Sequence, residues 1–271
     1  MGRLDRKVAF ITGAARGQGR SHAVRLAQEG ADIIGVDICA QLESVVYPMS
    51  TPDDFDQTVK EVEALGRRMV ALQADVRDVT ALQKAFDAGV NELGPVDIVL
   101  ANAGIGPSGL ASEQTQWDEV IGVNLTGVWN TGRVAIPSMV KRNQGGALVL
   151  TSSTGGLFGA PVPAAGMLGY TAAKHGVIGL MRSWANYLAP YYIRCNVVAP
   201  TTVRTPMAND GNVSSILEFV PELTGALTNA MPVEAVDPLD VSNAILWLVS
   251  AEARYITGTV VPVDAGQVNR R

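Results

Sequence analysis

The chain has 271 residues, of which 47% are hydrophobic and 17% are charged, a balance typical of a soluble globular protein with a substantial core. Its formal net charge is −5, and it has no cluster of lysines or arginines to follow phosphates, which argues against nucleic acid as a partner. The N-terminal sequence MGRLDRKVAFITG has neither a signal-peptide core nor a membrane-spanning run, and the two cysteines and two histidines lack metal-ligand spacing. We therefore expect a cytoplasmic protein without membrane contact or a metal.

Short apolar runs rich in β-branched residues alternate with longer stretches of helical periodicity. The strand candidates are residues 8–12, 31–37, 69–73, 96–101, 147–152, 194–200 and 257–266, and the helix candidates are 18–29, 54–66, 79–92, 114–141, 169–189 and 238–250. Continuous apolar runs are typical of strands that are buried on both faces. The sequence therefore predicts an α/β fold of the doubly wound Rossmann type, with a central, mostly seven-stranded parallel sheet in a single domain, 1–271.

A glycine-rich segment, TGAARGQG (12–19), connects the first predicted strand to the first predicted helix, with glycines at Gly13, Gly17 and Gly19. Glycines let the backbone turn tightly and approach a phosphate, while the N-terminus of a helix favours an anion. This position predicts a site for the pyrophosphate of a dinucleotide. The alternative, an ordinary tight turn, needs one glycine rather than three.

The second predicted strand ends at Asp37, 20 residues after Gly17. In folds of this type, a carboxylate here accepts hydrogen bonds from the adenosine ribose hydroxyls and repels a 2′-phosphate. The sequence therefore favours NAD over NADP as the cofactor. Arg16 leaves the alternative open, because a guanidinium beside the loop can pair with a 2′-phosphate once Asp37 has moved away.

Five ordered motifs give the chain a family resemblance. The T-G-x-x-x-G-x-G loop, NAG at 102–104, Asn124, Ser153 and the Y-x-x-x-K of 170–174 together resemble the short-chain dehydrogenase/reductase family over nearly the whole chain. The strings VDIC (36–39), ADVRD (74–78) and KHGVIGLMR (174–182), with a long connection containing Tyr47, look like its mycofactocin-associated, carveol-dehydrogenase-like branch. In that branch the insertion, near 38–53 here, is thought to help bury the NAD; the alternative is a solvated surface loop.

The resemblance implies the roles of the site residues. Tyr170 would be the general acid/base, Lys174 its activator, Ser153 a hydrogen-bond partner of the substrate oxygen and Asn124 an anchor for a proton-relay water. The implied cofactor contacts are Gly13, Arg16, Gly17, Gln18, Gly19, Asp37, Asp75, Val76, Asn102, Ala103, Gly104, Tyr170, Lys174, Pro200 and Thr205. Ser153 lies 17 residues before Tyr170, farther than in most relatives, and Ser152 would face the other side of its strand.

Residues four apart on a helix share a face, so Lys174 is expected beside Tyr170. A free tyrosine titrates near pH 10, and a useful base near neutrality needs a pKa roughly two to three units lower. One cation about 4 Å away at an effective dielectric of 20 contributes roughly 4 kcal/mol, so we expect Lys174 to lower the pKa of Tyr170. The alternative is two neighbours on an amphipathic helix face.

These expectations describe an NAD-dependent oxidoreductase that interconverts a secondary alcohol and a ketone on a mostly apolar small substrate. The resemblance implies a homotetramer with contacts around 110–141 and 170–189, and mycofactocin as the acceptor that reoxidises a tightly held NAD.

Apolar residues of 205–232 suggest a lid over the substrate, although such residues serve equally often as core or subunit contacts. A catalytically silent, NAD-sensing binding protein is the alternative function. A serine hydrolase is disfavoured because no G-x-S-x-G occurs.

Overall fold

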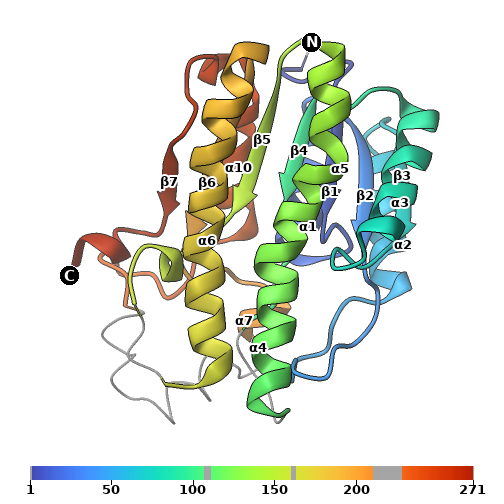
Figure 1. Cartoon of the computed structure of the whole chain (residues 1–271). Coiled ribbons are helices and arrows are strands. Elements are labelled where there is room, and N and C mark those ends of the chain that lie inside the picture. Colours follow the sequence, from blue (N-terminus) through green and yellow to red (C-terminus); the bar gives the residue numbers. More distant parts are fainter. Residues whose placement is uncertain (1, 107–110, 160–162, 210–227, 271) are drawn as a thin grey trace.

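The computed structural model describes residues 2–106, 111–159, 163–209 and 228–270, and its centre is a seven-stranded sheet in the order β3-β2-β1-β4-β5-β6-β7 (Figure 1). The strands are β1 (Val8–Thr12), β2 (Asp32–Asp37), β3 (Met69–Gln73), β4 (Ile98–Ala101), β5 (Gly146–Thr151), β6 (Ile193–Pro200) and β7 (Val260–Val263). All neighbouring strands are parallel; Ile11, for example, pairs with Gly35 of β2 and Leu100 of β4. The predicted parallel sheet is confirmed.

Helices cover both faces of the sheet, with α4, α5 and α6 on the near face in Figure 1. The main helices are α1 (Gly17–Gln28), α2 (Pro52–Glu63), α3 (Val79–Leu93), α4 (Glu113–Ile121), α5 (Gly127–Arg142), α6 (Ala165–Leu188) and α10 (Pro238–Val249), and a short α7 spans Pro206–Asn209. The neighbours Phe10 and Ile11 of β1 are fully buried in two different core clusters, the first with α3, α5 and α6 and the second with α1, α2 and α10. A continuous apolar run therefore supplies both cores, as in other doubly wound folds.

The predicted single helix 114–141 is wrong in one respect, because it is interrupted. After α4 the chain makes one π-helical segment, Gly122–Thr126, before α5 begins at Gly127. Asn124, a predicted site residue, lies inside this segment and is completely buried. Such π turns occur mostly as single insertions within α-helices and frequently at functional sites, and the added residue shifts the phase of the hydrophobic pattern without ending it, so the predicted range remained continuous.

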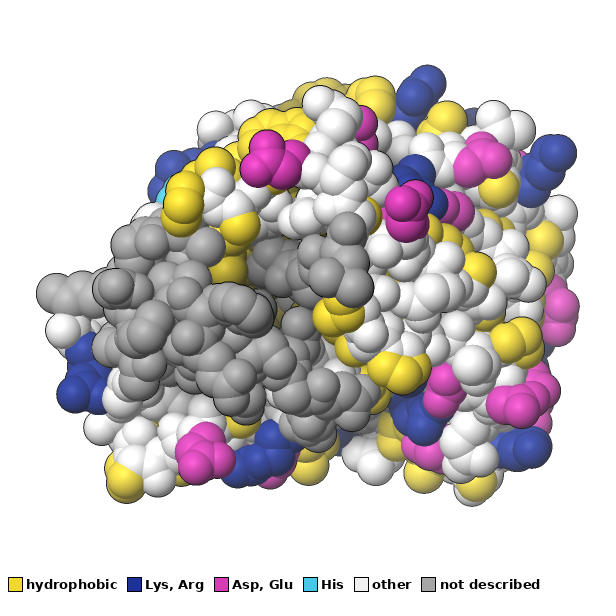
Figure 2. Space-filling model, turned by 90° about the horizontal axis from the view of Figure 1, so that it is seen from below, with side chains coloured by type: hydrophobic (Ala, Val, Ile, Leu, Met, Phe, Trp, Pro, Cys, Tyr) yellow, Lys and Arg dark blue, Asp and Glu magenta, His cyan; other side chains and the backbone are white. Residues whose placement is uncertain are grey.

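The carboxyl ends of the parallel strands meet at one edge of the sheet, the lower edge in Figure 1. Seen from below in Figure 2, the described part of this face carries scattered hydrophobic side chains, and charged side chains of both signs lie mostly toward its rim. The strand order reverses between β1 and β4, and in open α/β sheets ligands bind at this switch point. Within the described ranges, no helix combines the length and apolar character needed to cross a bilayer.

Candidate active site

The glycine loop after β1 has a geometry that favours glycine at three positions. Gly13 and Gly17 have φ angles of +71° and +55°, and a Cβ on Gly19 would lie 1.8 Å from the carbonyl oxygen of Gly13. The following helix, α1, begins without a side-chain cap and without an acidic residue in its first turn. Its first N–H groups are thus left to a ligand, and the helix end favours an anion there.

A cleft with about 860 Å³ of empty space, including its open mouth, lies at this edge of the sheet. Twelve predicted cofactor contacts line it: Gly13, Arg16, Gly17, Gln18, Gly19, Asp37, Asp75, Val76, Asn102, Ala103, Gly104 and Thr205. Pro200 does not line it; this residue is buried at the end of β6 beside Val263. Tyr170 and Lys174 lie next to the cleft rather than along its wall.

Sequence reasoning expected the insertion to help bury the cofactor and Met207 to lie over the substrate, but it did not name most of the other residues that line the cleft. The insertion contributes Ile38, Leu42, Tyr47, Met49 and Ser50, and other additional lining residues are Ala74, Ile105, Val123, Pro206 and Met207. The insertion is therefore not a solvated loop along its whole length: Leu42, Val45 and Tyr47 are buried, whereas Val46 is exposed. The phenolic oxygen of Tyr47 accepts a 2.9 Å hydrogen bond from the backbone N–H of Gly106, which fastens the insertion to the loop after β4.

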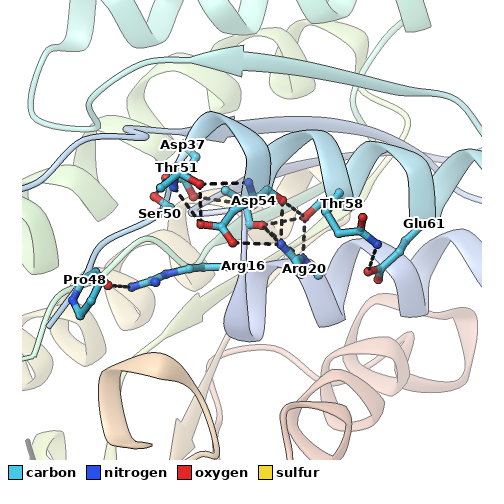
Figure 3. Close-up of polar contacts among 11 residues, drawn as sticks. Arg16, Arg20, Asp37, Pro48, Ser50, Thr51, Asp54, Thr58 and Glu61 are labelled. Atoms are coloured by element: carbon cyan, nitrogen blue, oxygen red, sulfur yellow. Dashed lines mark hydrogen bonds and ion pairs between the residues drawn. The ribbon is translucent and has the colours of Figure 1, made fainter. Parts of the chain in front are cut away.

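Asp37 has a fixed side chain at the end of β2 (Figure 3). One carboxylate oxygen accepts from the backbone N–H of Ala15 at 2.9 Å, and the other accepts from the hydroxyl of Ser50 at 2.6 Å and the N–H of Cys39 at 3.2 Å. The guanidinium of Arg16 reaches away from Asp37 and donates to the carbonyl of Pro48. The charged group at the predicted ribose site is therefore the carboxylate of Asp37 and not the guanidinium of Arg16.

Asn102, which follows β4, holds the two loops of the switch point together. Its side-chain amide donates to the carbonyls of Thr12 at 3.0 Å and Gly13 at 3.2 Å, and its own N–H donates to the Thr12 hydroxyl at 3.2 Å. Asp75 also has internal partners, because Arg77 donates to its carboxylate from the backbone at 2.8 Å and from the guanidinium at 2.6 and 2.8 Å. These contacts position the cleft wall.

Lys174 and Tyr170 lie one turn apart on α6, as predicted. The Lys174 ammonium is buried, donates to the carbonyl of Thr151 at 2.9 Å and lies 5.6 Å from the centroid of the Tyr170 ring. The Ser153 hydroxyl and the Tyr170 ring both lie beside Gly155, and Ser153 acts to lower the pKa of the phenol, whereas the Ser152 hydroxyl donates to the carbonyl of Lys174 at 2.8 Å. Of the two serines, Ser153 therefore faces the phenol.

The direction of the Tyr170 pKa differs from the expectation. Burial raises the pKa of Tyr170, and the hydrogen bond from Ser153 offsets this only in part. Burial also lowers the pKa of Lys174 to about 8. Removing a phenolate from water is costly, and the Coulomb estimate made from the sequence did not include that penalty. The expected lowering of the Tyr170 pKa is thus wrong for the protein without its cofactor, whose oxidised nicotinamide would add further positive charge.

Asn124 lies between the buried Lys174 ammonium and the loop after β4 that lines the cleft. Its side-chain amide donates to the carbonyl of Ile105 at 2.9 Å, and its side-chain oxygen accepts from the Ile105 N–H at 2.9 Å. A Cβ on Gly104 would lie 3.1 Å from that oxygen and 3.5 Å from the Lys174 ammonium nitrogen. Gly104 thus lets both side chains approach the backbone that lines the cleft.

The predicted lid, 205–232, is described only in part. Met207, in α7, lines the cleft, and Met231 is 60% exposed. Leu217, Phe219, Val220 and Leu223 lie outside the described residues.

The model of the enoyl-(acyl carrier protein) reductase family matches residues 13–267. The (−)-trans-carveol dehydrogenase of Rhodococcus erythropolis is 48% identical over 279 residues, covering 98% of this chain and 99% of that protein. An uncharacterized oxidoreductase of Mycobacterium tuberculosis is 54% identical over 269 residues, covering 99% and 98%. The crystal structure of carveol dehydrogenase from Mycobacterium avium in complex with NAD has a TM-score of 0.90 at 48% identity and covers 99% of this chain and 100% of that one. A short chain dehydrogenase from Mycobacterium paratuberculosis bound to NAD has a TM-score of 0.92 at 42% identity, with the same coverage.

Proposed function

Since the chain belongs to the short-chain dehydrogenase/reductase family and is an NAD-dependent oxidoreductase, we propose that it interconverts a secondary alcohol and a ketone on a mostly apolar small substrate. The observation that carries this proposal is that Ser153 and Tyr170 lie together beside Gly155, and that the Lys174 ammonium lies near the Tyr170 ring and beside Gly104, which lines the wall of the cleft. The apolar residues Ile105, Val123 and Met207 on that wall support an apolar substrate.

The proposed roles follow from the contacts. Tyr170 takes the proton of the substrate hydroxyl in oxidation and returns it to the carbonyl oxygen in reduction, while Ser153 holds that oxygen by a hydrogen bond. Lys174 supplies a buried positive charge, and Asn124, whose side chain is bonded to Ile105, anchors a proton-relay water. NAD, when bound, accepts or supplies the hydride and adds the positive charge of its oxidised ring to that of Lys174.

The proposed cofactor placement fits the residues that are present. The first N–H groups of α1 and the glycines of the loop would hold the pyrophosphate, and Asp37 would accept from the adenosine ribose hydroxyls. Asp75 and Val76 would contact the adenine, whereas Thr205, whose methyl group lies next to Gly17, would lie nearer the nicotinamide.

Turnover of a panel of secondary alcohols with NAD and an artificial electron acceptor tests the reaction. We expect hydrophobic secondary alcohols to be oxidised and primary alcohols or esters to remain unchanged. Binding of NAD without turnover of any alcohol or ketone in the panel would instead support a catalytically silent sensor.

Ketone reduction is expected to have a descending alkaline limb. The reaction needs the Lys174 ammonium, and because the pKa of this group lies at about 8, the ammonium is present below that pH and is lost as pH rises through it. The kcat/KM for the ketone should be constant below about pH 7 and then fall by up to tenfold per pH unit. In Lys174→Arg, a guanidinium that keeps its charge should remove this limb. A wild-type profile that stays constant to pH 10 would contradict the assignment.

We also propose that NAD is held tightly and is reoxidised in place by mycofactocin. The support is the insertion, which lines the cleft and is fastened to three other parts of the chain by Arg16, Gly106 and Glu119. Native mass spectrometry after extensive dialysis should find NAD still attached. Empty protein that regains full turnover with added NAD would indicate a freely exchanging cofactor.

A homotetramer is proposed from the outward faces of α4, α5 and α6. Trp117, Trp129, Leu168 and Tyr187 on these helices are 39%, 44%, 48% and 56% exposed. Large apolar side chains gathered on a surface favour a protein interface over solvent. The subunit count in the native mass spectrum tests this assembly.

A further inference from the structure

Discrimination between NAD and NADP depends on more than the presence of Asp37. A 2′-phosphate at the adenosine ribose needs the carboxylate to move away and a cation to approach. Asp37 is held by the N–H groups of Ala15 and Cys39 and by the Ser50 hydroxyl, which gives the shortest of the three contacts at 2.6 Å. Moving the carboxylate would break these hydrogen bonds, and bonds to a charged group are the costlier ones to lose.

The guanidinium of Arg16, beside the glycine loop, is also held in place by a hydrogen bond. Arg16, at the N-cap position of α1, donates to the carbonyl of Pro48, two residues before Ser50 (Figure 3). Pro48 and Ser50 both belong to the insertion, so one short segment restrains the carboxylate and the guanidinium together.

Ser50 is itself firmly placed, because helix α2 begins directly after it. Thr51 caps this helix: its N–H donates to the Asp54 carboxylate at 2.9 Å, and its hydroxyl accepts from the Asp54 N–H at 3.2 Å. The Thr58 hydroxyl, one turn on, donates to the Ala15 carbonyl at 2.7 Å, and Arg20 of α1 donates to the same carbonyl and to that of Asp54. Figure 3 shows this network running from the glycine loop to the start of α2.

We propose that Ser50 is a positioning residue for cofactor specificity: its hydroxyl holds the Asp37 carboxylate where a 2′-phosphate would have to bind, while the adjacent Pro48 carbonyl holds the cation that such a phosphate would need. NAD would leave Asp37 in place, whereas NADP would require its displacement. Loss of the Ser50 hydroxyl therefore favours NADP relative to NAD. This inference rests on the proposed placement of the dinucleotide in the cleft.

The test is an equilibrium competition. Purified full-length protein is incubated with equal concentrations of NAD and NADP until the bound composition is constant, and native mass spectrometry gives the ratio of the two bound forms. We expect Ser50→Ala to shift this ratio toward NADP by about tenfold, the effect of one hydrogen bond to a charged group. In Ser50→Ala combined with Arg16→Leu, the shift should largely disappear, because the 2′-phosphate then has no guanidinium to pair with.

Two variants serve as controls. Ser44→Ala makes the same change at another buried serine of the insertion, whose backbone N–H, and not its hydroxyl, contacts Glu119 at 2.9 Å, and it should retain the wild-type ratio. Ser50→Thr retains the hydroxyl and should do the same. If Ser50→Ala does not fold, Ser50→Cys, a weak donor of similar size, gives the same readout.

The outcomes distinguish failure of the proposed role of Ser50 from failure of the proposed function. If Ser50 only shapes the insertion, both dinucleotides weaken together and the ratio stays within twofold of wild type, which overturns the proposal. If wild-type protein binds neither dinucleotide, the proposed function fails instead.

Discussion

Tyr170→Phe is expected to lower kcat for the alcohol–ketone reaction by about 10³-fold while NAD remains bound. Phenylalanine keeps the ring that packs beneath the Lys174 ammonium, 5.6 Å from its centroid, but it has no proton to exchange with the substrate oxygen. The loss should appear in single-turnover rates in both directions, and the amount of bound NAD should match wild type in the native mass spectrum.

Tyr187→Phe provides the matched control, because Tyr187 lies on the same helix and is 56% exposed. This variant should retain wild-type kcat. Turnover of Tyr170→Phe within tenfold of wild type would remove Tyr170 from the proton transfer and leave Ser153 as the group to test next.

Gly19→Ala is expected to weaken NAD binding by about 100-fold or more, since displacements near 1 Å at a site can have effects of this size. The added methyl group would lie 1.8 Å from the Gly13 carbonyl oxygen and 2.9 Å from the Ala14 Cα, both of them backbone atoms. The loop must therefore move away from the start of α1, which separates the groups proposed to hold the pyrophosphate. Calorimetric titration of NAD-free protein measures the change.

Gly179→Ala is the control for the same substitution. Gly179 lies within α6, and a Cβ there would meet no heavy atom within 4 Å. Alanine is a better helix former than glycine, so this variant should bind NAD normally and unfold at a slightly higher temperature. Wild-type affinity in Gly19→Ala would place the pyrophosphate away from this loop.

The fold could be predicted because its signals are local. The runs VAFI (8–11) and ALVL (147–150) are apolar at every position, which predicts strands buried on both faces, and three glycines at the first turn predict a close backbone approach. Each predicted strand overlaps a strand of the sheet, although the last one is four residues, Val260–Val263, rather than the predicted ten.

The features that were missed depend on tertiary structure. The contact between Ser50 and Asp37 follows from the path of an irregular segment, for which no periodic signal exists. The pKa of Tyr170 depends on burial, which charge spacing along a helix does not measure. The interruption of 114–141 at Asn124 adds one residue to one turn, which shifts the phase of the hydrophobic pattern but leaves the helical range continuous.

That interruption also restricts how the chain can be recombined. Each residue of a helix advances its side chains by about 100°, so the wide turn at Gly122–Thr126 fixes the angular phase of α5 against α4. Removing one residue there would turn the buried side chains of α5, such as Val128 and Met139, out of the core. Chimeras with relatives should therefore keep the residue count of this segment, whatever side chains they exchange.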